Sequence, residues 1–320
     1  IYVYNMNFNH YEHIENHYQI DFSKYENENW IATEKIHGTN YSFICDGIQV
    51  VPAKRNLILT LDCKFYDHAS VFKIYEKNIM IIFNIIKKEN LQCKQIQLYG
   101  ELFGGSYNNI NQNISIIQKG VNYYSGHDFI AFDLKITCDN GIIYYYNHKD
   151  LIELLKMTNI KISPIIKSGT LKEVLKLNPK FESQIYKFYD LNKLENNYAE
   201  GVVIKLFEEN NVFNKEQENR IIFKYKNPDF SEMIAIVKTN KKENEFIENF
   251  KKYVTINRVN NINSKLLENE LITCEMLYDD ILIDLLKDIL SYDDITVNKY
   301  KKSCLGFCKG FLLKNKLIIV

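Results

Sequence analysis

The chain has 320 residues and a formal net charge of +0, with 46% hydrophobic and 25% charged residues. This length allows one large domain or two smaller ones, and the composition excludes a wholly disordered chain. The balanced charge excludes nucleic-acid binding by bulk charge, so any phosphate-binding surface must be a local patch. Since no run of about 18 uncharged apolar residues occurs, we expect no membrane span.

Cysteine usage predicts a reducing, intracellular compartment. The seven cysteines are odd in number and include no Cys-x-x-Cys pair, which favours neither a disulfide framework nor a zinc site. Cys304 and Cys308 are four residues apart, and we interpret them as core residues of a helix. No secretory signal opens the chain, so the cytoplasm is the first expectation. An organelle is the alternative, because a targeting segment could precede Ile1.

The first 230 residues alternate strand and helix patterns. Runs of β-branched and aromatic residues between turn signals predict strands at 30–33, 41–45, 48–51, 96–103, 128–136, 201–207 and 220–226. Helical spacing of apolar residues predicts helices at 65–89, 150–157 and 170–177. The expected fold class is therefore α+β, with mainly antiparallel sheets and flanking helices.

The pattern changes near residue 230. Helices are predicted at 243–253, 274–290 and 297–313, joined by Asn-rich connections. We therefore expect two domains, residues 1–230 and a small all-α domain of residues 231–320. A basic cluster in the second domain could bind a phosphate backbone or form a solvated helix face; it consists of Lys299, Lys301, Lys302 and Lys309.

The segment Glu34-Lys35-Ile36-His37-Gly38-Thr39-Asn40 carries the clearest chemistry. Gly38 lets the backbone turn close to a ligand, and a lysine amine can act as a nucleophile. A lysine three residues before a glycine is also common in surface loops. Further segments favour a site: Lys54-Arg55, YGELFGG at 99–105, FIAFD at 129–133, EGVVIK at 200–205 and FKYK at 223–226.

The last of these segments suits a triphosphate. Lys224 and Lys226 are two residues apart on a predicted strand, so both point to one face of the sheet. Tyr225 between them should face the core. Glycines beside the carboxylates of Glu101 and Glu200 leave room for a bulky ligand.

These segments together resemble the RNA ligase 2 and RNA-editing ligase family of covalent nucleotidyltransferases. EKIHGTN matches motif I of that superfamily, YGELFGG motif III, FIAFD motif IIIa, EGVVIK motif IV and FKYK motif V, in the family order. The resemblance spans about residues 30–230. His37 precedes the motif I glycine, where DNA ligases and capping enzymes usually carry an acidic residue or asparagine.

The resemblance implies roles for the catalytic group. Lys35 would attack the α-phosphate of ATP and carry AMP covalently, with His37 assisting. Lys224 and Lys226 would hold phosphate and offset its charge. Glu200 would bind Mg²⁺, with Mn²⁺ as a substitute, because hard cations prefer oxygen ligands.

Other residues would bind the nucleotide. Arg55 would contact a phosphate or the ribose, and Glu101 would accept hydrogen bonds from a ribose hydroxyl. Phe132, directly before an acidic residue, would stack on adenine. The remaining nucleotide contacts would come from Glu34 through its backbone and from Ile36 and Asn40.

Three of these assignments have structural alternatives. Phe132 lies in an apolar strand and could be a core residue, and His37 could be purely structural. Glu200 and Lys205 have opposite parity, so a regular strand would place them on different faces. Either Gly201 bends the chain there, or Lys205 serves only the surface, and Lys205 is therefore left out of the predicted site.

The resemblance implies an ATP-dependent RNA ligase that seals 3′-OH and 5′-phosphate ends, preferably at nicks in duplex RNA, and acts as a monomer. The helical second domain would hold RNA ends. The alternatives are a DNA ligase or a capping guanylyltransferase on the same fold, and a non-catalytic RNA-binding relative. His37 argues against the first two, and the intact set of lysines and glutamates argues against the third.

Overall fold

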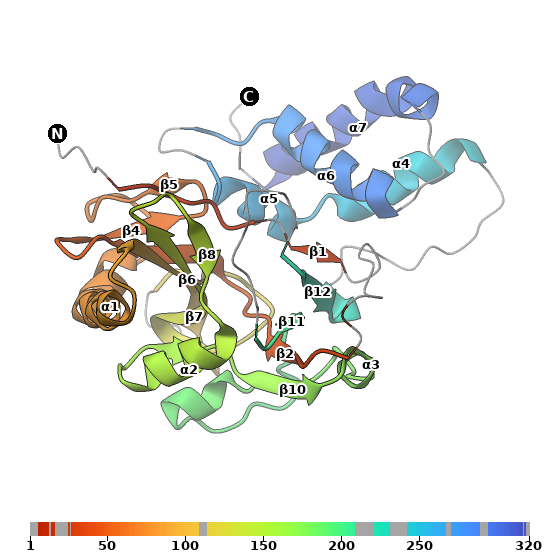
Figure 1. Ribbon diagram of the computed structural model, residues 1–320. Helices are drawn as coiled ribbons and strands as arrows, with labels where there is room; N and C mark the ends of the chain where they lie inside the picture. Colours follow the sequence, from red (N-terminus) through yellow and green to blue (C-terminus); the bar gives the residue numbers. More distant parts are fainter. Residues whose placement is uncertain are drawn as a thin grey trace. The chain divides into compact units, whose positions relative to one another are not determined.

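The computed structural model describes residues 6–12, 14–16, 25, 27–108, 114–208, 220–230, 242–266, 270–288, 294–315 and 317. The chain divides into two compact units, unit 1 with residues 1–230 and unit 2 with residues 231–320. Unit 1 holds two β-sheets with helices, and every element described in unit 2 is a helix (Figure 1). The α+β fold class predicted from the sequence is confirmed.

The larger sheet of unit 1 has seven strands. Their order is β5-β4-β3-β6-β7-β8, with β9 beside β7, and all neighbours are antiparallel except β7 and β9. Asp46-Gly47 forms the predicted hairpin turn, in which the Asp46 carboxylate accepts hydrogen bonds from the Ile48 and Gln49 amides. The strands are β3 (Thr39–Cys45), β4 (Val50–Lys54), β5 (Leu57–Ile58), β6 (Cys93–Ser106), β7 (Tyr124–Cys138), β8 (Ile143–Tyr145) and β9 (Lys161–Ile162).

The second sheet of unit 1 has five strands in the order β1-β12-β11-β2-β10, and only β1 and β12 are parallel. One face packs into a small core with Trp30, Val202 and Phe223. Because side chains alternate along a strand, the neighbouring residues point to the opposite face. The strands are β1 (Glu15–Asn16), β2 (Trp30–Glu34), β10 (Ile165–Gly169), β11 (Gly201–Leu206) and β12 (Ile222–Lys226).

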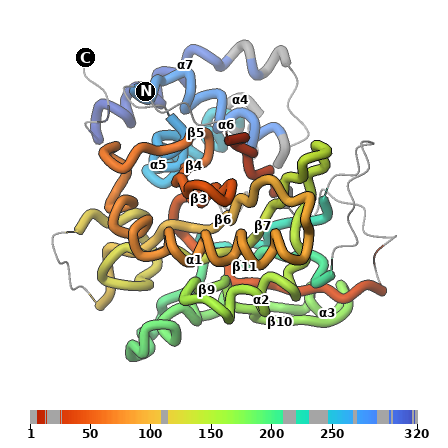
Figure 2. The backbone as a smooth tube through the Cα atoms, turned by 60° about the vertical axis from the view of Figure 1, so that its left-hand side comes forward, coloured from red at the N-terminus to blue at the C-terminus, as the bar shows by residue number. Residues whose placement is uncertain are grey.

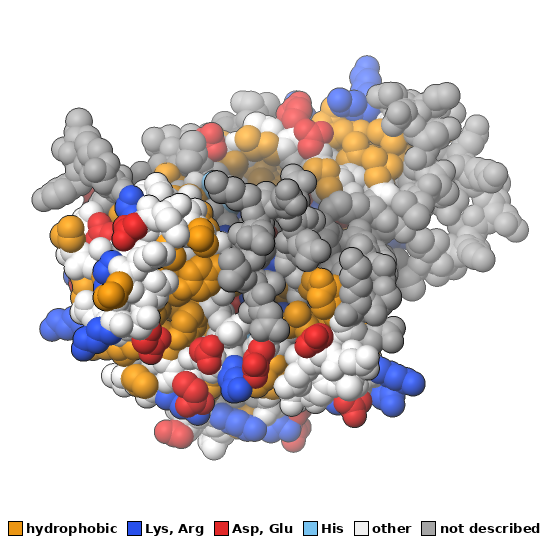
Figure 3. Space-filling model, viewed as in Figure 1, with side chains coloured by type: hydrophobic (Ala, Val, Ile, Leu, Met, Phe, Trp, Pro, Cys, Tyr) orange, Lys and Arg blue, Asp and Glu red, His pale blue; other side chains and the backbone are white. Residues whose placement is uncertain are grey.

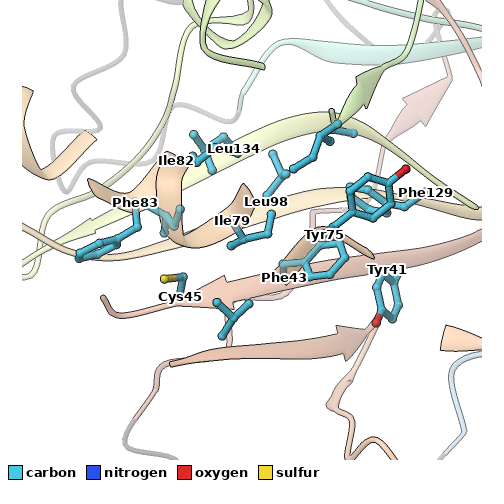
Figure 4. Packing of buried hydrophobic residues seen from close by; sticks show 14 of the residues in the cluster. Tyr41, Phe43, Cys45, Tyr75, Ile79, Ile82, Phe83, Leu98, Phe129 and Leu134 are labelled. Atoms are coloured by element: carbon cyan, nitrogen blue, oxygen red, sulfur yellow. The ribbon is translucent and has the colours of Figure 1, made fainter. Parts of the chain in front are cut away.

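The main core lies between helix α1 (His68–Glu89) and the seven-stranded sheet. The helix runs across the sheet (Figure 2) and contacts β3, β4, β6 and β7. Its apolar residues recur at helical spacing, so Ile79, Ile82 and Phe83 face the sheet while Ile74 is exposed. Figure 4 shows these side chains against residues of three strands: Tyr41, Phe43, Cys45, Leu98, Phe129 and Leu134.

The remaining helices of unit 1 are short. They are α2 (His148–Lys156), α3 (Leu171–Val174), and the 3₁₀ turns η3 (Ile185–Tyr189) and η4 (Pro228–Phe230). The helix predicted at 170–177 is a single turn. Thr170 and Glu173 form a capping box at its start, and the chain leaves the helix after Leu175.

Unit 2 contains α4 (Lys242–Tyr253), α5 (Ile256–Asn263), α6 (Cys274–Asp288) and α7 (Asp294–Lys314). Cys304 and Cys308 are buried in its core, as predicted. Helix α5 was not predicted, because its Asn-rich sequence is typical of a connection. Thr255 caps it, and Val259 and Ile262 bury its apolar side, so packing outweighs the weak propensity.

On the face shown in Figure 3, acidic and basic side chains of the described residues are mixed, and no large patch of one charge is seen there. This mixing agrees with the net charge of +0. All seven cysteines are free thiols. Among the described helices, none combines the length and apolarity needed to cross a bilayer.

Candidate active site

Glu200 is the centre of the predicted site. Its Oε2 accepts a hydrogen bond from Lys35 Nζ at 2.7 Å and lies 3.2 Å from His37 Nδ1, and its Oε1 lies 3.2 Å from Lys226 Nζ. The side chain is 6% exposed. Burial opposes its ionisation, but Lys35 and Lys226 hold the pKa of Glu200 well below its usual range. Three predicted residues from motifs I and V therefore meet at the carboxylate of the fourth, Glu200 of motif IV.

Gly201 makes this meeting geometrically feasible. Its φ of +140° lies in the left-handed region, and a Cβ there would be 2.4 Å from the carbonyl oxygen of Tyr225. The unusual φ breaks the regular alternation of the strand, so Glu200 and Lys205 point to the same side of the sheet.

The surface interpretation of Lys205 is therefore wrong. Its side chain is 1% exposed and forms an ion pair with Asp133, with Nζ 2.5 Å from Oδ1. Nζ also donates to the carbonyl oxygen of Phe132 at 2.8 Å. Lys205 thus joins the five-stranded sheet to β7 beside the predicted adenine-binding residue.

The motif I loop is held close to β6 and to Tyr123. A Cβ on Gly38 would be 2.3 Å from the carbonyl oxygen of Leu102, so only glycine fits this approach. The His37 amide donates to the Tyr123 hydroxyl at 2.9 Å, and the His37 ring makes an edge contact with Phe230. The His37 Nε2 atom is buried and has no hydrogen-bond partner among the described residues. His37 therefore has both a structural contact and a buried ring nitrogen without a described partner.

Glu101 and Asn40 are direct neighbours in the ladder between β6 and β3. Burial raises the pKa of Glu101 to about 8, and the charge of Glu200 adds to this, while Lys35 and Arg55 oppose it. These interactions place Glu101 and Arg55 in the electrostatic environment of Lys35. At neutral pH the Glu101 carboxyl can both donate and accept a hydrogen bond.

Phe132 lies on β7, one strand from Glu101. The ladder shifts its register between Tyr99 and Gly100, whose partners are Asp133 and Ala131, so Phe132 is the extra residue of a β-bulge. Its side chain is half-buried and packs beside Tyr11 rather than in the main core. Part of its surface therefore remains solvent-accessible.

The remaining predicted residues have different surroundings. Lys224 lies on β12 two positions before Lys226 and so on the same face, while Tyr225 packs toward the core as predicted. The Glu34 backbone is hydrogen-bonded to the segment between β9 and β10, because its carbonyl oxygen accepts a hydrogen bond from Ser163 Oγ at 2.5 Å. The Ile36 side chain is buried in an apolar cluster, so any contact of Ile36 with a nucleotide falls to its backbone.

The donors at the site fit one divalent cation with a nucleotide. In the described part of the chain, no three His, Cys, Asp or Glu side chains converge as a metal cage. Mg²⁺ is usually held by one or two carboxylates together with substrate phosphates. Glu200 supplies such a carboxylate beside Lys35 and Lys226, and the His37 ring beside it carries a second nitrogen, Nε2, for which the described part of the chain offers no partner.

Four further residues at the site were not predicted: Tyr11, Tyr123, Asp133 and Arg220. Asp133 follows Phe132 in motif IIIa, and Arg220 opens the predicted strand at 220–226, so sequence signals existed for both. Tyr11 and Tyr123 lie outside every motif. Only the folded chain brings them to the site.

Glu34 should make stability depend on pH. Burial raises the pKa of its carboxyl from 4.5 to about 7. Between pH 4.5 and about 7 the Glu34 carboxyl ionises in the unfolded chain but stays protonated in the folded one, which favours unfolding. The contribution of Glu34 to stability is therefore lost as the pH rises. We expect the unfolding free energy of the wild type to fall relative to Glu34→Gln, by up to about 3 kcal/mol. Urea unfolding between pH 4.5 and 7 measures this difference.

The control is Glu76→Gln, which changes an exposed carboxylate on α1. Its stability curve should run parallel to that of the wild type. Parallel curves for Glu34→Gln as well would show that the Glu34 carboxyl ionises normally in the folded protein.

The chain matches one protein family and is similar to known proteins over part of their length. The family profile described as RNA ligase matches residues 28–226, which include every predicted site residue. A curated relative, RNA-editing ligase 2, mitochondrial, from Trypanosoma brucei brucei, is 24% identical over 202 residues, or 56% of this chain and 49% of that protein. The chain thus spans about half the length of this relative.

Solved structures of Naegleria gruberi RNA ligase also resemble the chain. A variant with ATP and Mn gives a TM-score of 0.44 at 16% identity, over 68% of this chain and 56% of that one. The form with PPi gives a TM-score of 0.40 at 18% identity, over 64% of this chain and 51% of that one. The family match covers more than half of the chain and all five motifs, and the chain therefore belongs to the RNA ligase family.

Proposed function

We propose that this protein is an ATP-dependent RNA ligase that joins 3′-OH and 5′-phosphate ends. The observation that carries the proposal is the contact of the Lys35 amine with Glu200, which also holds Lys226 and His37. A nucleophilic amine, a carboxylate for a cation and a second lysine for phosphate are the groups that nucleotidyl transfer needs. Membership of the RNA ligase family supports this chemistry.

In the first step Lys35 Nζ attacks the α-phosphorus of ATP. A P–N bond forms, the P–O bond to pyrophosphate breaks, and AMP remains on the lysine. The amine has to leave Glu200 and lose its proton before it attacks. Lys224 and Lys226 offset the charge that develops on the phosphates. Glu200 would hold Mg²⁺ or Mn²⁺, which would supply further neutralisation of the phosphates when bound.

The nucleotide is held by the residues around Lys35. Phe132 offers its solvent-accessible surface to adenine, and Glu101 meets a ribose hydroxyl as donor or acceptor. Arg55, Asn40 and the backbone of residues 34–36 complete the contacts.

Two further transfers complete the reaction. AMP moves from Lys35 to the RNA 5′-phosphate, which forms a 5′–5′ anhydride. The 3′-OH then attacks that phosphate and releases AMP. Each step is a displacement at phosphorus, so the same cations serve all three.

The two units divide this work. Residues 1–230 form the adenylyltransferase domain, and residues 231–320 form a helical domain that holds RNA ends. Nicked duplex RNA is the proposed substrate of a monomeric enzyme in a reducing compartment, either the cytoplasm or an organelle. The seven free thiols support a reducing compartment.

Lys35→Ala should abolish covalent labelling by ATP, because it removes the attacking amine. Lys35→Arg should fail equally, since a guanidinium stays protonated. Labelling with α-labelled ATP and with α-labelled GTP measures this and separates a ligase from a capping enzyme. The control is Lys156→Ala, an exposed lysine on α2. Label that persists on Lys35→Ala would assign the nucleophile to another residue.

A fragment of residues 1–230 should still form lysyl-AMP but seal nicked RNA at least tenfold more slowly than the full chain. All five motifs lie within this fragment, whereas the proposed RNA contacts of unit 2 are lost. Labelling and gel-based sealing assays compare the two proteins, with circular dichroism as the control for folding. Sealing at the full rate would contradict the role given to residues 231–320.

Ribose at the 3′-OH end should be required for sealing. Because the enzyme has no net charge, discrimination of RNA from DNA must come from 2′-hydroxyl contacts and A-form geometry. Replacing the two terminal nucleotides of the 3′-OH strand by deoxynucleotides should slow sealing at least tenfold, because the attacking hydroxyl is then misplaced. The same change on the 5′-phosphate side is the control and should matter less. Equal rates would indicate a DNA ligase.

A further inference from the structure

A second buried carboxylate, Asp133, links the two sheets of unit 1. Arg220 donates to both of its oxygens, from Nη1 to Oδ2 and from Nη2 to Oδ1, each at 2.8 Å. Lys205 Nζ contacts Oδ1, and the Tyr11 hydroxyl donates to Oδ2. Burial opposes ionisation, yet Arg220 and Lys205 hold the pKa of Asp133 well below its usual range. We refer to Tyr11, Asp133, Lys205 and Arg220 as the Asp133 cluster.

Tyr11 reaches this cluster from the N-terminal segment of residues 6–12. The segment is fixed along β6, where the Asn7 amide donates to Gln95 and the Asn9 amide to Gln97. The Tyr11 ring then meets the edge of the Phe132 ring, with centroids 5.0 Å apart and planes at 66°. Tyr11 is 7% exposed, and the hydrogen bond from its hydroxyl to Asp133 fixes its ring beside Phe132. The contact restricts how the half-buried Phe132 ring can turn.

Arg220 reaches the cluster from the other sheet. It comes directly before Ile221 and strand β12, which carries Lys224 and Lys226. Its guanidinium lies 3.9 Å from the ring centroid of Tyr145 on β8. The guanidinium forms two hydrogen bonds with Asp133 and also lies over the Tyr145 ring, so its orientation is fixed. A lysine would not reproduce this geometry. Arg220 therefore ties the phosphate-binding strand to the adenine-binding strand.

We propose that Tyr11 and Arg220 are positioning residues for ATP. Tyr11 sets the orientation of the Phe132 ring, and Arg220 sets the distance between that ring and the lysines of β12. Neither residue contacts Lys35 or Glu200 in the described contacts. The inference rests on the proposed function, since Phe132 must meet adenine for the cluster to act on ATP binding.

The two contributions predict a specific kinetic effect. Lys35 and Lys226 stay paired with Glu200 when either contact is lost, and only their distance from the Phe132 ring changes, so the rate of the chemical step at saturating ATP should stay within about twofold. The KM for ATP should rise about fivefold for Tyr11→Phe, which removes one buried hydrogen bond. It should rise at least tenfold for Arg220→Lys, which removes a bidentate contact.

Matched controls separate positioning from stability. Tyr75→Phe also removes a buried tyrosine–aspartate hydrogen bond, the 2.5 Å bond from Tyr75 on α1 to Asp128 on β7. Arg258→Lys also replaces a buried arginine that is paired with two carboxylates, those of Asp280 and Asp284 in unit 2. Both controls should lower the melting temperature but leave the KM for ATP unchanged.

The experiment measures lysyl-AMP formation by the full chain against ATP concentration, with a thermal melt of each variant. A rise in KM for Tyr11→Phe and Arg220→Lys alone supports the inference. Unchanged KM values, or equal rises in the controls, overturn it and reduce the Asp133 cluster to a structural role. A wild type that forms no lysyl-AMP would overturn the proposed function itself, which is a distinguishable outcome.

Discussion

The burial of the Glu200 carboxylate is the constraint on which the site depends. An ionised group that is 6% exposed must be paired, and here Lys35, Lys226 and His37 supply the partners. Lys35 and His37 come from the motif I loop after β2, Lys226 comes from β12, and Glu200 itself directly precedes β11. The carboxylate therefore draws three separated segments to one point, and it holds the proposed nucleophile where a cation and a triphosphate would meet it.

A single backbone conformation allows that arrangement. Gly201 has a φ of +140°, which turns the Glu200 side chain to the same side as Lys205. Lys205 can then reach Asp133 on the other sheet while Glu200 holds Lys35. The first carboxylate, Glu200, joins the five-stranded sheet to its motif I loop, and the second, Asp133, joins the two sheets. The first collects the groups proposed for chemistry, and the second fixes Phe132, the residue proposed for adenine.

Much of the fold followed from local pattern. The strands at 30–33 and 41–45 and the long helix were predicted within a few residues, because alternation and helical spacing are strong there. Strands β1, β5, β8, β9 and β10 and helix α5 were missed. Strand β5 pairs with the adjacent β4 but is too short to show alternation, whereas β9 and β10 pair with the distant strands β7 and β2. Asn-rich sequence favoured a connection at residues 256–263, but burial of Val259 and Ile262 decided for a helix.

By itself the sequence determined the family, the fold class and the candidate nucleophile, because the ordered motifs around Lys35, Glu101, Glu200 and Lys226 are local patterns of residue type and spacing. Their roles in catalysis remain predictions. Only the tertiary structure decided that Glu200 and Lys205 lie on the same side, which depends on the φ of Gly201, and the contribution of Tyr11, which lies outside every motif. Contacts between residues more than a hundred positions apart leave no local pattern, so they become visible only when the sheets have packed together.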